Sequence, residues 1–239
     1  MRRAVSEIKH TLDSESATAV ILSFVGGLLD VYCLFNFGVY AMLHTGNIIK
    51  LVTYLLDGNT VMFLDTLFVI LAFAAGIYLA NVFEDRRGAK NTGGLLRIAI
   101  LLLAVSALLP NDTPPGELSV LKMIAASVFG FEGAFLVHSF IRFGSYAYSA
   151  TTMTANINRL VTNIYRRVTT KSRLHSYAIR VYLMIFLCFM LGVGAGYAYL
   201  RFLPAFSGGF MGLYGYNLIL LLPLACLLLL LRKAERTRP

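Results

Sequence analysis

The feature that most constrains this chain is the gathering of its apolar residues into six long blocks. A helix of a soluble protein carries one apolar stripe, whereas a helix that crosses a bilayer needs about 20 mostly apolar residues in a row. The pattern predicts an all-α membrane protein with six transmembrane helices and no room for a separate soluble domain. The predicted spans are Ala17–Phe37, Val61–Asn81, Leu95–Leu109, Val120–Ile141, Ala178–Leu200 and Leu213–Leu231.

Composition and charge placement agree with a membrane location. Hydrophobic residues make up 58% of the chain and charged residues 14%, against about 25% charged in soluble domains. The basic residues gather before the first span, after the second, between the fourth and fifth, and after the sixth, whereas Pro110–Ser119 has none. Because basic loops stay in the cytoplasm, both termini are predicted to be cytoplasmic. The same placement argues against a nucleic-acid partner for the net charge of +9.

A sequence repeat divides the chain into two related parts. Residues 45–53 read TGNIIKLVT and residues 154–162 read TANINRLVT, and glycine-containing segments precede both, at Gly27–Asp30 and at Gly130–Gly133. The repeat predicts two three-helix halves, residues 1–110 and 111–239, within one membrane domain. Since each half has an odd number of spans, the halves are predicted to be inverted. Inverted repeats are typical of secondary transporters and of channels built from paired half-helices.

Each repeated segment contains a polar break between apolar stretches, Thr45–Asn47 in the first half and Thr154–Asn156 in the second. Three interpretations stay open: a broken or re-entrant segment within the membrane, an amphipathic helix at its surface, or Thr and Asn that cap a surface helix. If the breaks lie at depth, Asn47 and Asn156 are predicted to occupy pseudo-symmetric places near the middle of the protein.

These residues resemble the YoaK family, uncharacterised six-span bacterial membrane proteins grouped under a domain of unknown function. The matching positions are Gly26, Gly27, Asp30, Thr45-Gly46-Asn47 and Met153-Thr154-Ala155-Asn156, within a resemblance from about residue 17 to residue 231. The chain departs from the family pattern at Ala155, usually glycine, and at Glu132-Gly133, where the family often has Gln-Asn. The resemblance implies a six-helix fold in the bacterial cytoplasmic membrane, and it implies no substrate.

Asp30 and Glu132 occupy corresponding regions of the first and fourth spans. A charge near the bilayer centre costs about 3 kcal/mol or more, so such residues usually face a cavity or a partner. The two carboxyl groups are therefore predicted to border one central site, where Asp30 carries protons. The structural alternatives are that Asp30 caps broken backbone near Gly26–Gly27 or pairs with Lys50, and that Glu132 pairs with a basic residue of the cytoplasmic connection.

Two further sets of residues complete the predicted site and its scaffold. Thr45, Asn47, Thr154 and Asn156 offer donors and acceptors for a polar or ionic substrate. Small residues four apart let membrane helices approach closely, which predicts helix packing at Gly26, Gly27, Gly76, Gly192 and Gly196.

The pattern as a whole indicates a secondary transporter for a small molecule or ion, either alone or as a homodimer within the lipid bilayer. The alternatives are an assembly or sensing subunit without transport activity and a passive channel. The sequence contains no nucleotide loop, serine elbow, zinc motif or thiol pair. We therefore expect no enzyme activity, no cofactor and no metal.

Overall fold

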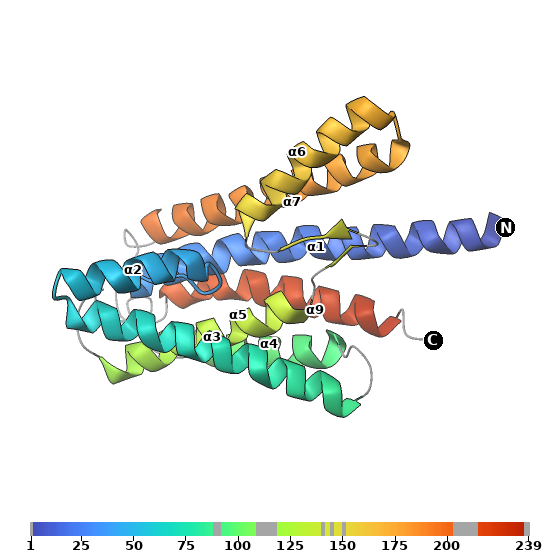
Figure 1. Cartoon of the computed structure of the whole chain (residues 1–239). Coiled ribbons are helices and arrows are strands. Elements are labelled where there is room, and N and C mark those ends of the chain that lie inside the picture. The colour runs from blue at the N-terminus through green and yellow to red at the C-terminus, as the bar shows by residue number, and fades with distance from the viewer. Residues whose placement is uncertain are drawn as a thin grey trace.

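A computed structural model describes residues 2–87, 92–108, 119–139, 142–143, 146–149, 152–202 and 215–236, which are almost entirely helical (Figure 1). The helices are α1 (Arg2–Phe37), α2 (His44–Leu56), α3 (Thr60–Arg87), α4 (Thr92–Leu108), α5 (Val120–Ser139), α6 (Met153–Thr170), α7 (Arg173–Phe202) and α9 (Leu221–Arg236), and a 3-10 helix, η2 (Gly215–Leu220), directly precedes α9. Two short strands, β1 (Arg142–Phe143) and β2 (Tyr146–Ala147), pair antiparallel.

Four helices are long and apolar enough to cross a membrane, and they contain the candidate spans Glu15–Phe37, Thr60–Arg86, Val120–His138 and Leu174–Phe202. Helices α4 and α9 contribute two shorter apolar segments, Gly93–Leu108 and Asn217–Arg232. The chain is therefore an all-α, multi-pass integral membrane protein. Three of the predicted span ends lie outside the described residues, namely Leu109, Ile141 and Leu213. The predicted boundary between the halves, at residue 110, also lies outside them.

The last span departs from the sequence prediction, because its regular α-helix begins only at Leu221 and a 3-10 turn comes before it. Pro223 explains the difference. A proline has no N–H and its ring clashes with the carbonyl four residues earlier, so it is accommodated best in the first turn of an α-helix. In the 3-10 turn, Asn217 accepts a hydrogen bond from the Tyr32 hydroxyl of α1 at 2.5 Å and donates to the Ala107 carbonyl of α4 at 3.3 Å.

Two helix pairs dominate the packing: α1 lies along α7, and α3 lies along α5. The shorter helices α2 and α6 pack on α3 and α7, respectively. The start of α1 and the end of α9 lie at the same end of the bundle (Figure 1). The turn from α2 to α3 and the turn from α6 to α7 lie at opposite ends (Figure 1).

Glycines mark the places where these pairs come closest. In the first pair, a methyl group on Gly27 of α1 would collide with the Phe189 carbonyl oxygen of α7, and one on Gly196 of α7 would collide with Val31. Gly192 likewise lies against α1, Gly76 and Gly130 lie at the contact between α3 and α5, and Gly26 is buried in α1. Because lipid tails are as apolar as the side chains, such close packing is a main source of attraction between membrane helices.

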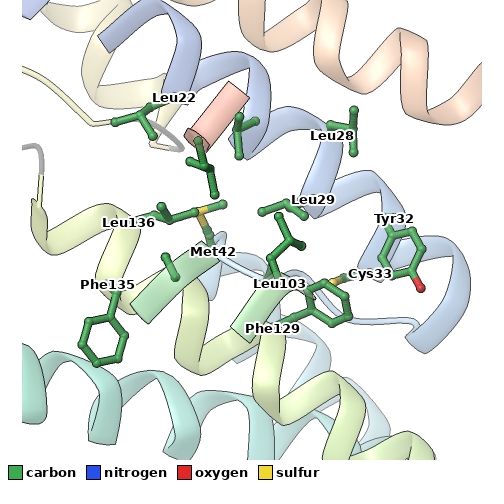
Figure 2. Packing of buried hydrophobic residues seen from close by; sticks show 14 of the residues in the cluster. Leu22, Leu28, Leu29, Tyr32, Cys33, Met42, Leu103, Phe129, Phe135 and Leu136 are labelled. Carbon is green, nitrogen blue, oxygen red and sulfur yellow. The ribbon is translucent and has the colours of Figure 1, made fainter. Parts of the chain in front are cut away.

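The centre of the bundle is a buried apolar cluster to which α1, α5 and the connection between α1 and α2 contribute, together with α3, α4, α7 and α9. Figure 2 shows Met42 of that connection beside Leu29 of α1 and Leu136 of α5. Cys33 and Phe129 belong to the same cluster, and both are almost fully buried. A segment between helices thus reaches the middle of the protein.

Candidate functional site

The connection from α1 to α2 turns back into the bundle. The chain leaves α1 at Phe37 and reverses at Gly38, whose φ of 71° lies in the left-handed region that glycine adopts at little cost. The Met42 N–H then donates a hydrogen bond to Asp30 Oδ1 at 2.8 Å. Because Asp30 lies about two turns before the end of α1, the connection returns roughly 10 Å along that helix.

Asp30 is buried and anchors this connection. Besides the bond from Met42, the backbone N–H groups of Ala41 and Leu43 face its carboxylate. Asp30 therefore bonds to the backbone of residues 41–43. The alternative that its carboxyl caps broken backbone near Gly26–Gly27 does not describe this contact. Lys50 does not serve as the partner of Asp30 in this arrangement.

Lys50 instead braces the reversal of the chain. Its Nζ donates to the Gly38 carbonyl at 2.9 Å and lies 4.4 Å from the centre of the Tyr40 ring. In the second repeated sequence segment, residues 154–162, Arg159 stands at the position of Lys50, and its Nη1 donates to Asn156 Oδ1 at 3.4 Å. Both basic residues thus support the connection that leads into their own helix.

Glu132 has different surroundings from Asp30. Its side chain has no exposed surface, and neither of its carboxylate oxygens has a hydrogen-bond partner among the described residues. The expected ion pair with a basic residue of the cytoplasmic connection is not found within the described part of the chain. Apolar residues flank Glu132 on its own helix, and an ionised carboxylate buried without a partner is strongly unfavourable.

The two carboxyl groups belong to one region of the bundle. Cys33 of α1 lies within electrostatic range of both Asp30 and Glu132. The connection links them as well, because the residue after Glu132, Gly133, packs against Ala41 and Met42 so closely that a methyl group would collide with either. Asp30 and Glu132 therefore lie in one buried region, beside the inserted segment.

Asn47 and Asn156 are both buried, and their side chains make the same local contacts. Asn47 accepts from the Tyr40 N–H at 2.8 Å and donates to the Tyr40 carbonyl at 2.7 Å. Asn156 accepts from the Ser149 N–H at 3.2 Å and donates to the Ser149 carbonyl at 2.5 Å. Each amide thus holds the backbone that precedes its helix, and neither cap residue, Leu43 or Thr152, makes a side-chain capping bond.

The two threonines proposed beside these asparagines, Thr45 and Thr154, are exposed. Of the six candidate binding residues, the structure therefore places Asp30 and Glu132 in one buried region. Asn47 and Asn156 are engaged with backbone, and the threonines face outward.

Two polar pairs between α3 and α5 were missed by the sequence reasoning. Asp65 and Lys122 are both buried and lie within electrostatic range of each other. At the other end of these helices, His138 Nε2 lies 3.1 Å from Glu84 Oε2. The available signal was the presence of opposite charges within, or at the ends of, the predicted second and fourth spans.

An apolar groove of about 370 Å³ opens on the outside of the bundle. Its walls come from α3, α4 and α5 and comprise Phe68, Ala72, Leu102, Met123, Ile124, Ser127, Val128 and Phe131. Neither Asp30 nor Glu132 lines it, so the groove and the buried carboxyl groups are separate features. Within the described ranges, no group of three or more His, Cys, Asp or Glu side chains is arranged to hold a metal ion.

Comparison with known proteins identifies a family. The family model described as "Protein of unknown function (DUF1275)" matches residues 18–231, which include both repeated segments and every candidate site residue. No curated protein and no solved structure matches the chain. The family match confirms the resemblance inferred from the sequence motifs, and the chain belongs to the DUF1275 family of YoaK-like, uncharacterised membrane proteins.

Proposed function

We propose that this protein is a small secondary transporter made of two inverted three-helix repeats, residues 1–110 and 111–239, around a site bordered by Asp30 and Glu132. It transports a small molecule or ion across the bacterial cytoplasmic membrane, as a monomer or a homodimer, with both termini in the cytoplasm. The observation that carries this proposal is the correspondence between the contacts made by the two halves.

The glycine contacts correspond residue by residue. Each position in α1 has a counterpart in α5 that lies a fixed number of residues later, as Gly130 follows Gly27. Each position in α3 likewise has a counterpart in α7 at a second fixed offset, as Gly196 follows Gly76. With these two offsets, the contact of Gly27 with Phe189 corresponds to the contact of Gly130 with Val69. In the same way, the contact of Gly196 with Val31 corresponds to the contact of Gly76 with Ala134. Exchanging the halves therefore converts the α1–α7 crossing into the α5–α3 crossing, as a pseudo-two-fold axis requires.

The connections support the same symmetry. The amide clamps of Asn47 and Asn156 have the same bonding pattern, and the helices that follow them end at opposite ends of the bundle (Figure 1). In transporters with inverted repeats, movement of one repeat against the other exposes a central site alternately to the two sides of the membrane.

Within this proposal the two carboxyl groups have separate tasks. Asp30 Oδ1 accepts a hydrogen bond from Met42 of the inserted connection, so this carboxylate positions that segment, although its Oδ2 has no partner among the described residues. Neither oxygen of Glu132 has a partner among the described residues, so we assign the binding of the transported or coupled cation or proton to Glu132 rather than to Asp30, for which the sequence analysis predicted the proton-carrying role. Ionisable residues buried within membrane spans commonly mark ion pathways.

Transport by the purified full-length chain in proteoliposomes tests the proposal. The vesicles carry a proton or sodium gradient and an internal pH dye, and they are offered amino acids, sugars, nucleosides and inorganic ions in turn. We expect uptake of at least one solute that depends on the gradient, is lost in Glu132→Gln and persists in Asp85→Asn, which removes an exposed carboxylate of α3. Passive flux would instead indicate a channel, and no flux together with a stable co-purifying protein would indicate a subunit. Either result contradicts the proposal.

A further inference from the structure

Helix α6 carries three different stripes along its length. The first faces α7: Asn156 and Asn163 are buried, and Asn163 Oδ1 lies 2.9 Å from Nδ1 of His175 in α7. The second consists of exposed apolar residues at the spacing of one helical face, Ile157, Val161, Ile164 and Val168. The α6–α7 hairpin projects from the bundle (Figure 1), so this apolar face is free of the other helices.

The third stripe is basic. Arg159 and Arg166 lie on the side of α6 opposite the apolar stripe, and Arg167 and Lys171 follow at the end of the helix. The side chains of Arg166 and Lys171 are exposed, and that of Arg167 is half-buried. An apolar stripe opposite a basic one is typical of helices that lie at a membrane surface.

Among the described residues, no carboxylate balances the positive charge of this region. No acidic residue occurs between Glu132 and Glu235. Across the described ranges, none of the basic side chains of α6 forms an ion pair with a carboxylate. Their charge therefore remains available to an external anion.

The equivalent helix of the first half shows that the fold does not require this charge. Helix α2 also has an exposed apolar face, which includes Ile48, Val52 and Leu55. Its one basic residue, Lys50, donates to the Gly38 carbonyl and lies over the Tyr40 ring. Of these two helices, only α6 carries a cluster of basic residues.

We propose that α6 binds the headgroups of anionic phospholipids. In this arrangement the apolar stripe contacts the acyl chains, and Arg166, Arg167 and Lys171 contact the headgroup phosphates. Guanidinium groups suit this task because their planar donors can bond two phosphate oxygens at once. The inference does not depend on transport activity, and a passive channel or a subunit would bind the same lipids.

Native mass spectrometry of the detergent-solubilised full chain tests it with phosphatidylglycerol and phosphatidylcholine as probes. The wild type is expected to retain phosphatidylglycerol in preference to phosphatidylcholine. The triple variant Arg166→Gln, Arg167→Gln, Lys171→Gln should lose that preference, with affinity falling by about 100-fold if each basic residue contributes on the order of 1 kcal/mol. A melting curve for each variant checks that it remains folded.

The matched control removes the same charge elsewhere. Arg86, Arg201 and Arg232 are exposed basic residues of α3, α7 and α9, and their combined change to Gln should leave the preference intact. Equal losses in the two triple variants would show a general charge effect and overturn the proposal. Displacement of the lipid by inorganic phosphate at similar concentration, or equal retention of both lipids by the wild type, would also overturn it.

Discussion

Asn47 and Asn156 make the same pair of hydrogen bonds, each to both backbone groups of the residue seven positions earlier in the chain. Both side chains are buried, and each amide fixes the backbone that leads into its helix, α2 or α6. This shared geometry gives a structural reason for the asparagine in each repeated segment.

Removal of either amide should destabilise the protein by a similar amount. We expect Asn47→Ala and Asn156→Ala each to lower the free energy of unfolding by about 2 kcal/mol, since two backbone groups lose their partner. Unfolding in mixed detergent micelles measures the change. If the clamps act independently, the double variant should show the sum of the two losses. A negligible effect at one of the two positions would contradict the equivalence.

Helix α7 offers a matched test of the close crossings. Gly196→Val should disrupt the contact with Val31 and cost about 1–3 kcal/mol through overpacking. Gly194→Val, in the same helix, should cost much less, because nothing lies within 4 Å of a methyl group placed there. Gly76→Val should match Gly196→Val in magnitude. Thermal denaturation in detergent compares the three variants, and a similar loss at Gly194 would refute the packing argument.

Asp30 should matter to the fold through its acceptor oxygens. Asp30→Ala leaves the buried Met42 N–H without this partner, which should lower the free energy of unfolding by about 1–3 kcal/mol. Asp30→Asn keeps one acceptor oxygen and should lose less. Chemical unfolding of the purified variants checks the order, and equal stability of Asp30→Ala and the wild type would show that the contact with Met42 contributes nothing.

Glu132 should behave in the opposite way. Glu132→Met replaces a buried carboxyl that has no partner among the described residues by an apolar side chain of similar length, so stability should stay the same or rise by about 1–3 kcal/mol. Gradient-driven uptake should nevertheless disappear. The combination of retained stability and lost uptake separates a binding role from a structural one. Unfolding caused by Glu132→Met would point to a structural role instead.

Much of the membrane framework could be predicted from the sequence, because each span is a continuous run of mostly apolar residues. The end of α1 at Phe37 and the start of α5 at Val120 agree with the predicted boundaries. The return of Met42 to Asp30 could not be predicted, since it depends on a chain reversal at Gly38 and on contacts with α5.

For the site itself, the sequence indicated which residue types belong to it but not what surrounds each of them. Asp30 and Glu132 fall in corresponding regions of the sequence, yet under the proposed correspondence of the two halves Gly133, rather than Glu132, is the counterpart of Asp30. A shift of one residue on a helix moves a side chain by about 100° around the axis. For this reason two carboxyl groups at nearly the same place in the repeat have different surroundings.

The central claim, that the halves are inverted, is tested most directly by labelling the turns that end α2 and α6. In a background with Cys33, Cys188 and Cys226 changed to Ala, single cysteines replace Asp57 and Thr170, which are both exposed. A membrane-impermeant thiol reagent is added to intact cells, and Asp112→Cys serves as a further site expected outside. We predict that cysteines at positions 57 and 112 react in intact cells and that a cysteine at 170 reacts only after permeabilisation. Labelling of positions 57 and 170 from the same side would contradict the inverted arrangement.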